Sequence, residues 1–222
     1  MKFWDWNFTF EILPLLARAA LVTLEATVIG FVVAVILGLC FAIGRMFGPK
    51  WLSIPLAGFI EFIRSTPLLI QIFFIYFVFP EFGVEIEAMT AGVLALGLHY
   101  ATYCSEVYRA GLANIPRGQW EASTALNMST FHVFRDVIIP QAIPPIVPAL
   151  GNYLVALFKD TPLLSAIAVL ELMQTAKIIG SENFRYTEPI TLVGLIFLIF
   201  SLIAAGLVRA VEVWLRRRVI HS

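Results

Sequence analysis

The segment ALVTLEATVIGFVVAVILGLCFAIG, residues 20–44, decides the fold class of this chain. A membrane-spanning helix needs about 20 consecutive, mostly apolar residues. This run is longer than that and contains a single charged residue, Glu25. The chain as a whole has 222 residues and is 60% hydrophobic and 14% charged, whereas soluble domains carry roughly 25% charged residues. The sequence therefore predicts an all-α, polytopic membrane protein.

Four more apolar runs repeat this pattern along the chain. They cover residues 55–79, 88–108, 138–158 and 190–208. The run 138–158 contains four prolines, which membrane helices accept when neighbouring groups satisfy the freed carbonyls. We expect about five transmembrane helices. Residues 163–173 are too few to span a bilayer and are predicted to form a surface or re-entrant helix.

The distribution of basic residues predicts the orientation, because lysine and arginine favour the cytoplasmic side of a membrane. If the C-terminus is inside, the cytoplasmic loops and tail hold most of the 15 basic residues: Arg45, Lys50, Arg109, Arg117, Arg135, Arg209, Arg216, Arg217 and Arg218. The outer turn PEFGVEIEA then has acids and no base. The predicted orientation is N-terminus outside and C-terminus in the cytoplasm.

Composition and motifs argue against several classes of function. The formal net charge is zero, which gives no reason to expect nucleic acid as a partner. Cys40 and Cys104 both lie in apolar runs, so a disulfide framework is not expected. The sequence has no H-E-x-x-H motif, no Cys/His cluster and no G-x-x-x-x-G-K-[ST] phosphate loop. We therefore expect no catalytic residue, no metal site and no nucleotide site in this chain.

The largest predicted cytoplasmic loop, residues 116–137, has the pattern of two short helices. The first has an apolar face at helical spacing, formed by Ala122, Ala125 and Leu126. Asn127 is expected to end it in the left-handed conformation, and Ser129 is expected to cap the second helix. The second helix has its own apolar face, formed by Phe131, Phe134 and Ile138. Packing on the protein's own spans and docking to a partner are both open from this pattern.

Within the loop, EASTALN (residues 121–127) followed by IIP (residues 138–140) resembles the EAA signature of bacterial binding-protein-dependent ABC importer permeases. Two other stretches, FIRSTPLL (62–69) and KDTPLL (159–164), are similar to the polar amino-acid branch of that family, which carries histidine, glutamate, glutamine or arginine. The resemblance extends over about residues 18–212. The loop departs from the signature at two positions, with Ser123 for the second alanine and Asn127 for the glycine.

The resemblance implies the fold and the domain limits. It implies a type I ABC importer transmembrane fold in the bacterial cytoplasmic membrane. Residues 1–18 would be an external segment, 19–212 the permease domain and 213–222 a cytoplasmic tail. The coupling loop would cover residues 116–137.

The resemblance also implies the partners. They would be a cytoplasmic ABC ATPase dimer, a second permease, identical or homologous, an extracytoplasmic solute-binding protein and membrane lipid. ATP and Mg²⁺ would be used by the ATPase, and this chain would bind no cofactor.

The resemblance further implies that the loop is set in a groove of the ATPase. We expect polar anchors at Glu121 and Arg135 and apolar anchors at Trp120 and Phe131. The full set of expected coupling residues is Gly118, Trp120, Glu121, Ala122, Ser123, Asn127, Phe131, Arg135 and Pro140.

Polar residues inside the predicted spans are candidates for a substrate path, since charged side chains in a bilayer are costly and usually functional. Glu61 and Arg64 lie three residues apart and can pair, either structurally or as part of a path. His99 can equally be a packing residue. The expected path residues are Arg64, Thr66, Gln71, His99, Tyr103, Asn152, Lys159, Asp160 and Thr161.

Three classes of function remain to be weighed. The leading hypothesis is the permease subunit of an ATP-driven importer for a polar amino acid or a related zwitterion such as ectoine. The alternative is an ion-coupled secondary transporter, which usually has paired broken helices at the membrane midplane; only one clearly proline-rich span is present. An intramembrane enzyme would need a nucleophile and base or a metal cluster, and no such set can be assembled.

Overall fold

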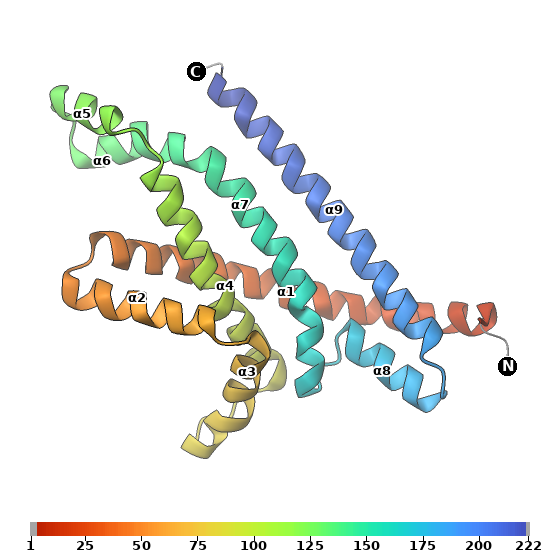
Figure 1. The fold of residues 1–222 in the computed structure, drawn as a ribbon. Helices are drawn as coiled ribbons and strands as arrows, with labels where there is room; N and C mark the ends of the chain where they lie inside the picture. The colour runs from red at the N-terminus through yellow and green to blue at the C-terminus, as the bar shows by residue number, and fades with distance from the viewer. Residues whose placement is uncertain (1–3, 221–222) are drawn as a thin grey trace.

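The computed structural model of this chain consists of helices and their connections, with no strand in the described residues, 4–220 (Figure 1). The side chains of residues 216 and 218–220 are not described. The extreme ends of the predicted external segment (1–3) and of the predicted tail (221–222) lie outside the described residues.

The helices follow one another with short connections. In chain order they are α1 (Trp6–Phe47), α2 (Lys50–Ser65), α3 (Leu68–Phe73), the π-helix η1 (Phe74–Val78), the 3₁₀-helix η2 (Phe79–Phe82), α4 (Ala88–Ala113), α5 (Arg117–Ala125), α6 (Thr130–His132), the π-helix η3 (Val133–Ile138), α7 (Ile139–Asp160), the 3₁₀-helix η4 (Thr161–Ile167), α8 (Leu172–Glu182) and α9 (Thr187–Ile220).

Each of the five predicted spans lies in helical structure, although the helices differ in length and one span is divided among several helices. By length and apolar composition, three stretches of residues 4–220 could cross a membrane: Trp6–Phe47, Thr130–Ile167 and Thr187–Leu215. A fourth candidate is the pair Lys50–Ser65 and Leu68–Phe82, which bends by 105°. The remaining predicted span, residues 88–108, lies in α4, which falls outside this set, so the count of five stays a prediction.

The prediction of one short helix over residues 163–173 is wrong. The segment begins in the 3₁₀-helix η4, turns at Ala168 with a φ of 60° and enters α8 only at Leu172. Glu171 fixes this later start, because its carboxylate accepts hydrogen bonds from the backbone N–H groups of Met173 (2.9 Å) and Gln174 (2.7 Å). These are two of the donors that a helix leaves unpaired at its first turn.

Close packing between α1 and α4 forms the centre of the fold. Small buried residues recur every four positions along α1: Ala26, Gly30, Ala34, Gly38 and Ala42. A Cβ atom at Gly38 would lie 2.6 Å from Cβ of Cys104 on α4, so the two helices approach as closely as small-residue faces allow in membrane proteins. A second core joins the N-terminal half of α1 to α8 and the start of α9.

The arrangement places the predicted cytoplasmic elements at one end. In Figure 1, α4 and α7 converge on α5 and α6, and the C-terminal end of α9 points to the same side. The segments α3 and α8 lie toward the opposite end. This arrangement agrees with the predicted orientation, which itself stays a prediction.

Candidate coupling loop and polar path

The turn at Asn127 has the geometry that the sequence predicts. Asn127 has a φ of 51° and follows the last turn of α5. The N–H of Met128 donates to the carbonyl of Ser123 (3.1 Å), and the N–H of Asn127 donates to that of Thr124 (2.9 Å). These two bonds form a Schellman motif, in which a left-handed residue satisfies the free carbonyls at a helix end. The expected left-handed asparagine is confirmed.

The second half of the loop differs in part from the expectation. Ser129 occupies the N-cap position of α6, as predicted, but its hydroxyl lies 2.7 Å from Nδ1 of His132 and makes no capping bond to the backbone. The α-helix is only three residues long and continues as the π-helix η3 into α7. Pro140 lies at the junction of η3 and α7.

One face of the loop packs against the protein itself. Ile138 is fully buried and Ser123 is 3% exposed. The ring of Trp120 packs edge-on against Phe134, with centroids 5.5 Å apart. The predicted apolar anchor Trp120 therefore belongs mainly to the inner face. Gln119 and Gln141 add a hydrogen bond of 3.2 Å across the loop.

The other face of the loop is open. Leu126 is 75% exposed and Phe131 is 66% exposed, and Glu121 and Ala122 are also exposed. Large exposed apolar side chains beside polar groups are typical of interaction surfaces. Of the remaining expected coupling residues, Gly118, Arg135 and Pro140 are likewise exposed.

The first residues of the expected polar path lie at a break between α2 and α3. Pro67 lacks an N–H and disfavours the helical conformation at the residue before it, so Thr66 is extended (φ −102°, ψ 140°). Nε2 of Gln71 donates to the carbonyls of Ile63 (2.7 Å) and Thr66 (3.1 Å) and to the hydroxyl of Thr66 (2.8 Å). Gln71 therefore satisfies the backbone groups that the break leaves free.

This break is joined to α4 by two contacts. Nδ1 of His99 lies 3.2 Å from Oε1 of Gln71. The guanidinium of Arg64 lies over the ring of Tyr103, with Cζ 5.1 Å from the ring centroid. Within the described residues, Arg64 makes no ion pair with Glu61, so the expected pairing is wrong. The face of Tyr103 holds the cation instead.

Two tyrosines that the sequence analysis did not place on the path extend the cluster to α7. The hydroxyl of Tyr100 donates to Oδ2 of Asp160 at 2.7 Å. Tyr153 lies beside Tyr103, with ring centroids 5.4 Å apart. The sequence offered a signal for Tyr100, because it is a polar residue of the predicted span 88–108 and directly follows His99. Tyr153 carried no separate signal, because one tyrosine in an apolar run is ordinary packing.

Three expected path residues lie apart from this cluster. Asn152 faces a different hollow of about 380 Å³, which it lines together with Arg209 and Glu212 between α7 and α9. Lys159 is exposed. Thr161 is fully buried, and its hydroxyl donates to the carbonyl of Phe158 at 2.7 Å, which caps the end of α7.

Comparison with known families decides the identity of the fold. Residues 30–217 match the family described as binding-protein-dependent transport system inner membrane component. The chain belongs to this family. It is therefore a multi-pass membrane permease, and the all-α ABC importer fold expected from the loop signature is confirmed.

Relatives and solved structures of this family are similar along nearly their whole length. A probable amino-acid ABC transporter permease of Sinorhizobium fredii is 46% identical over 211 residues, covering 95% of this chain and 91% of the relative. The glutamine transport system permease GlnP of Escherichia coli is 34% identical over 211 residues, covering 94% of this chain and 96% of the relative.

Among solved structures, that of an amino acid ABC transporter with histidines has a TM-score of 0.89 and 35% identity, covering 94% of this chain and 98% of that one. The inward-facing methionine transporter MetNI has a TM-score of 0.68 at 23% identity, covering 90% and 98%, which bears on the fold alone.

Proposed function

We propose that the chain moves a polar amino acid, or a related zwitterion, into the cell as the membrane subunit of an ATP-driven importer. The observation that carries this proposal is the coupling loop, in which a left-handed Asn127 keeps the signature's turn and presents Glu121, Leu126 and Phe131 outward. The relatives named as amino-acid and glutamine permeases support an amino-acid cargo for this chain as well.

The proposed partners follow from the same loop. A separate ABC ATPase dimer binds the exposed face of the loop and supplies the energy from ATP and Mg²⁺. A second permease, identical or homologous, completes the path. A solute-binding protein delivers the cargo from outside.

The polar cluster supports a zwitterionic cargo. Nε of Arg64 is buried without a hydrogen-bond partner among the described residues, and a guanidinium is suited to a carboxylate. Asp160 accepts the hydroxyl of Tyr100 and retains acceptor capacity for an ammonium group. The aromatic rings of Tyr100, Tyr103 and Tyr153 lie together between these two charges. This set offers complementary groups to both ends of an amino acid.

The experiment that tests the coupling role is Glu121→Lys, assayed by co-purification of the ATPase with the permease complex in detergent. Glu121 is exposed in the second turn of α5, so reversing its charge leaves the fold intact. We expect retention of the ATPase to fall by about tenfold, because truncating or reversing one close charge of an interface commonly costs this much or more. Glu85→Lys, an equally exposed glutamate before α4, is the matched control. Unchanged retention and unchanged transport in Glu121→Lys would show that Glu121 is not an anchor.

A further inference from the structure

The coupling loop touches the end of α1 through an aromatic contact. The ring of Phe134 lies between those of Trp120 and Phe47, at centroid distances of 5.5 and 5.9 Å and interplanar angles of 78° and 77°. Edge-to-face rings at such distances attract one another beyond their burial. Phe47 is the last residue of α1. Three consecutive rings therefore connect α5, η3 and α1.

Close to this contact, a hollow separates the helix ends, although η3 itself packs against α4 and α7. A hollow of about 580 Å³ lies between the ends of α1, α4 and α7, and its wall is apolar. Phe47 and Phe134 are on its wall, together with Ile43, Leu112 and Ile146. Beside this hollow, the contact between the rings of Phe134 and Phe47 joins the loop to the end of α1.

At the same end, α1 is fixed to α4 by charge. Glu106 on α4 accepts a hydrogen bond from Arg45 on α1 and is bound by Arg109, with Nη2 at 2.6 Å and Nε at 3.0 Å. The two arginines bind different oxygens of the same carboxylate: Arg45 binds Oε1 and Arg109 binds Oε2. Two turns before Arg45 in α1, Gly38 packs directly against Cys104 of α4. Charge and close packing therefore hold α1 against α4 near the predicted cytoplasmic end.

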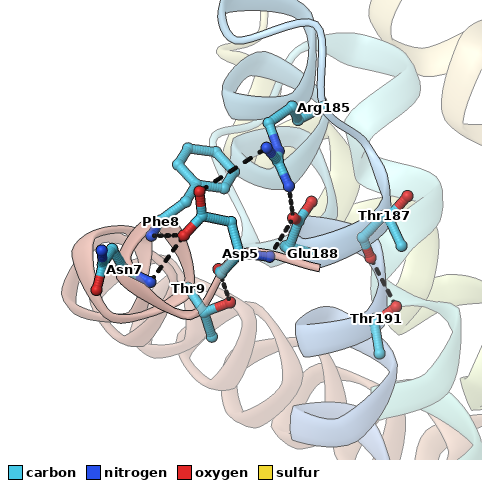
Figure 2. Close-up of polar contacts among 8 residues, drawn as sticks. All are labelled: Asp5, Asn7, Phe8, Thr9, Arg185, Thr187, Glu188 and Thr191. Atoms are coloured by element: carbon cyan, nitrogen blue, oxygen red, sulfur yellow. Dashed lines mark hydrogen bonds and ion pairs between the residues drawn. The ribbon is translucent and has the colours of Figure 1, made fainter. Parts of the chain in front are cut away.

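The far end of α1 is fixed to the start of α9 (Figure 2). The N–H of Asp5 donates to Oε1 of Glu188 at 3.0 Å. Arg185 pairs with that same carboxylate and lies 3.9 Å from Oδ2 of Asp5. Its guanidinium also lies 5.6 Å from the ring centroid of Phe8. A displacement of α1 along its 42 residues therefore reaches α9.

We propose that Phe134 and Phe47 pass the stroke of the ATPase from the coupling loop into α1. This gives the stroke a second route, beside the direct chain connections of the loop to α4 and α7. Both residues are positioning residues, since neither contacts the cargo. The inference rests on the proposed function, because the loop has a stroke to pass on only if an ATPase binds it.

The test substitutes Phe47→Ala in the complete transporter, reconstituted in vesicles with its ATPase and binding protein. Phe47 carries the test because it is 58% exposed, whereas Phe134 also packs inside the loop. The readouts are ATPase retention, ATP hydrolysis and uptake of a mixture of radiolabelled L-amino acids. Phe10→Ala is the matched control, at a similarly exposed position near the other end of α1. Phe47→Tyr, which keeps the ring, is the rescue variant.

We expect Phe47→Ala to retain the ATPase while uptake per ATP hydrolysed falls by about tenfold, within the range by which residues along coupling networks alter coupling. Phe47→Tyr should restore the ratio, and Phe10→Ala should leave it unchanged. An unchanged ratio in Phe47→Ala, or loss of the ATPase from it, would overturn the inference. If the wild-type permease retains no ATPase, the proposed function itself fails, and this outcome is read separately from the ratio.

Discussion

At the scale of single residues, Asn127 is the informative departure from the loop signature. A left-handed backbone is costly for most side chains, and asparagine is among the few that tolerate it. The Schellman bonds of Met128 and Asn127 show that the turn is complete with asparagine in place. The side chain of Asn127 is exposed, so it adds surface to the face that we propose binds the ATPase.

This turn predicts the outcome of two substitutions. Asn127→Gly should keep the loop conformation and wild-type uptake, because glycine is the commonest residue at this position. Asn127→Val should destabilise the turn by about 1 kcal/mol or more, since a β-branched residue is poorly suited to a positive φ. The rate of limited proteolysis within the loop measures the difference. Equal cleavage rates for the valine and glycine variants would contradict this account.

Glu171 predicts a pH dependence of stability. It lies outside the predicted spans and is fully buried at the start of α8. Burial raises the pKa of its carboxyl, and the N–H groups of Met173 and Gln174 only partly oppose this. A raised folded-state pKa means that the contribution to stability is present below the unfolded pKa and is lost as pH rises through the folded pKa.

The measurement is thermal unfolding in detergent across about pH 4 to pH 8, a range that begins near the ordinary glutamate pKa. The melting temperature of the wild type should fall more with rising pH than that of Glu171→Gln. Glu182→Gln, an exposed glutamate at the other end of α8, should behave like the wild type. A pH profile of Glu171→Gln that parallels the wild type would show that Glu171 does not contribute.

At the scale of elements, the sequence predicts the helices well and their interruptions less well. Apolar runs locate the five helical regions because burial in lipid depends on composition over about 20 residues. The start of α8 was missed because a glutamate is an uncommon N-cap, so Glu171 gave no signal. Between α2 and α3, the chain bends by 105° after Pro67, and Gln71 satisfies the carbonyls that this bend leaves free.

The sequence indicated some residues of the polar cluster, such as Arg64 and His99, but it missed Tyr100 and Tyr153 and did not predict the contacts. Helical spacing suggested Glu61 as the partner of Arg64, whereas a ring from another helix holds the guanidinium. Likewise Trp120 is half-buried against Phe134 by tertiary packing, which helical spacing within α5 does not reveal. Local sequence patterns predict which residues share a face of a helix. The packing of several helices decides which residues that face contacts.

The contact between α1 and α4 predicts a strong effect at Gly38. A Cβ atom there would lie 2.6 Å from Cβ of Cys104 and 2.8 Å from the carbonyl oxygen of Ala101. Gly38→Ala should therefore force the helices apart and destabilise the fold by about 1–3 kcal/mol, the usual cost of overpacking. Thermal unfolding in detergent measures this loss. Gly206→Ala on α9 should be tolerated, because no atom of another described helix lies within 4 Å of a Cβ added at that position. Equal stability of the two variants would contradict the packing described for α1 and α4.

At the scale of the whole molecule, the fold separates two tasks. The coupling loop, at the predicted cytoplasmic end, presents an exposed face to the ATPase that we propose. The polar cluster around Arg64, Tyr103 and Asp160 joins α2, α4 and α7, and we propose that it binds a cargo with both charges. The long helix α1 contacts the first region through Phe47 and is bound to α9 at its other end.

The central claim, that ATP drives uptake through this permease, is tested most directly by transport in sealed vesicles. The complete transporter is supplied with radiolabelled L-glutamine and L-arginine, and either ATP or an imposed proton or sodium gradient. The account predicts uptake with ATP, ATPase and binding protein together, and no uptake from a gradient alone. Uptake driven by an ion gradient without ATP would contradict it and would favour a secondary transporter.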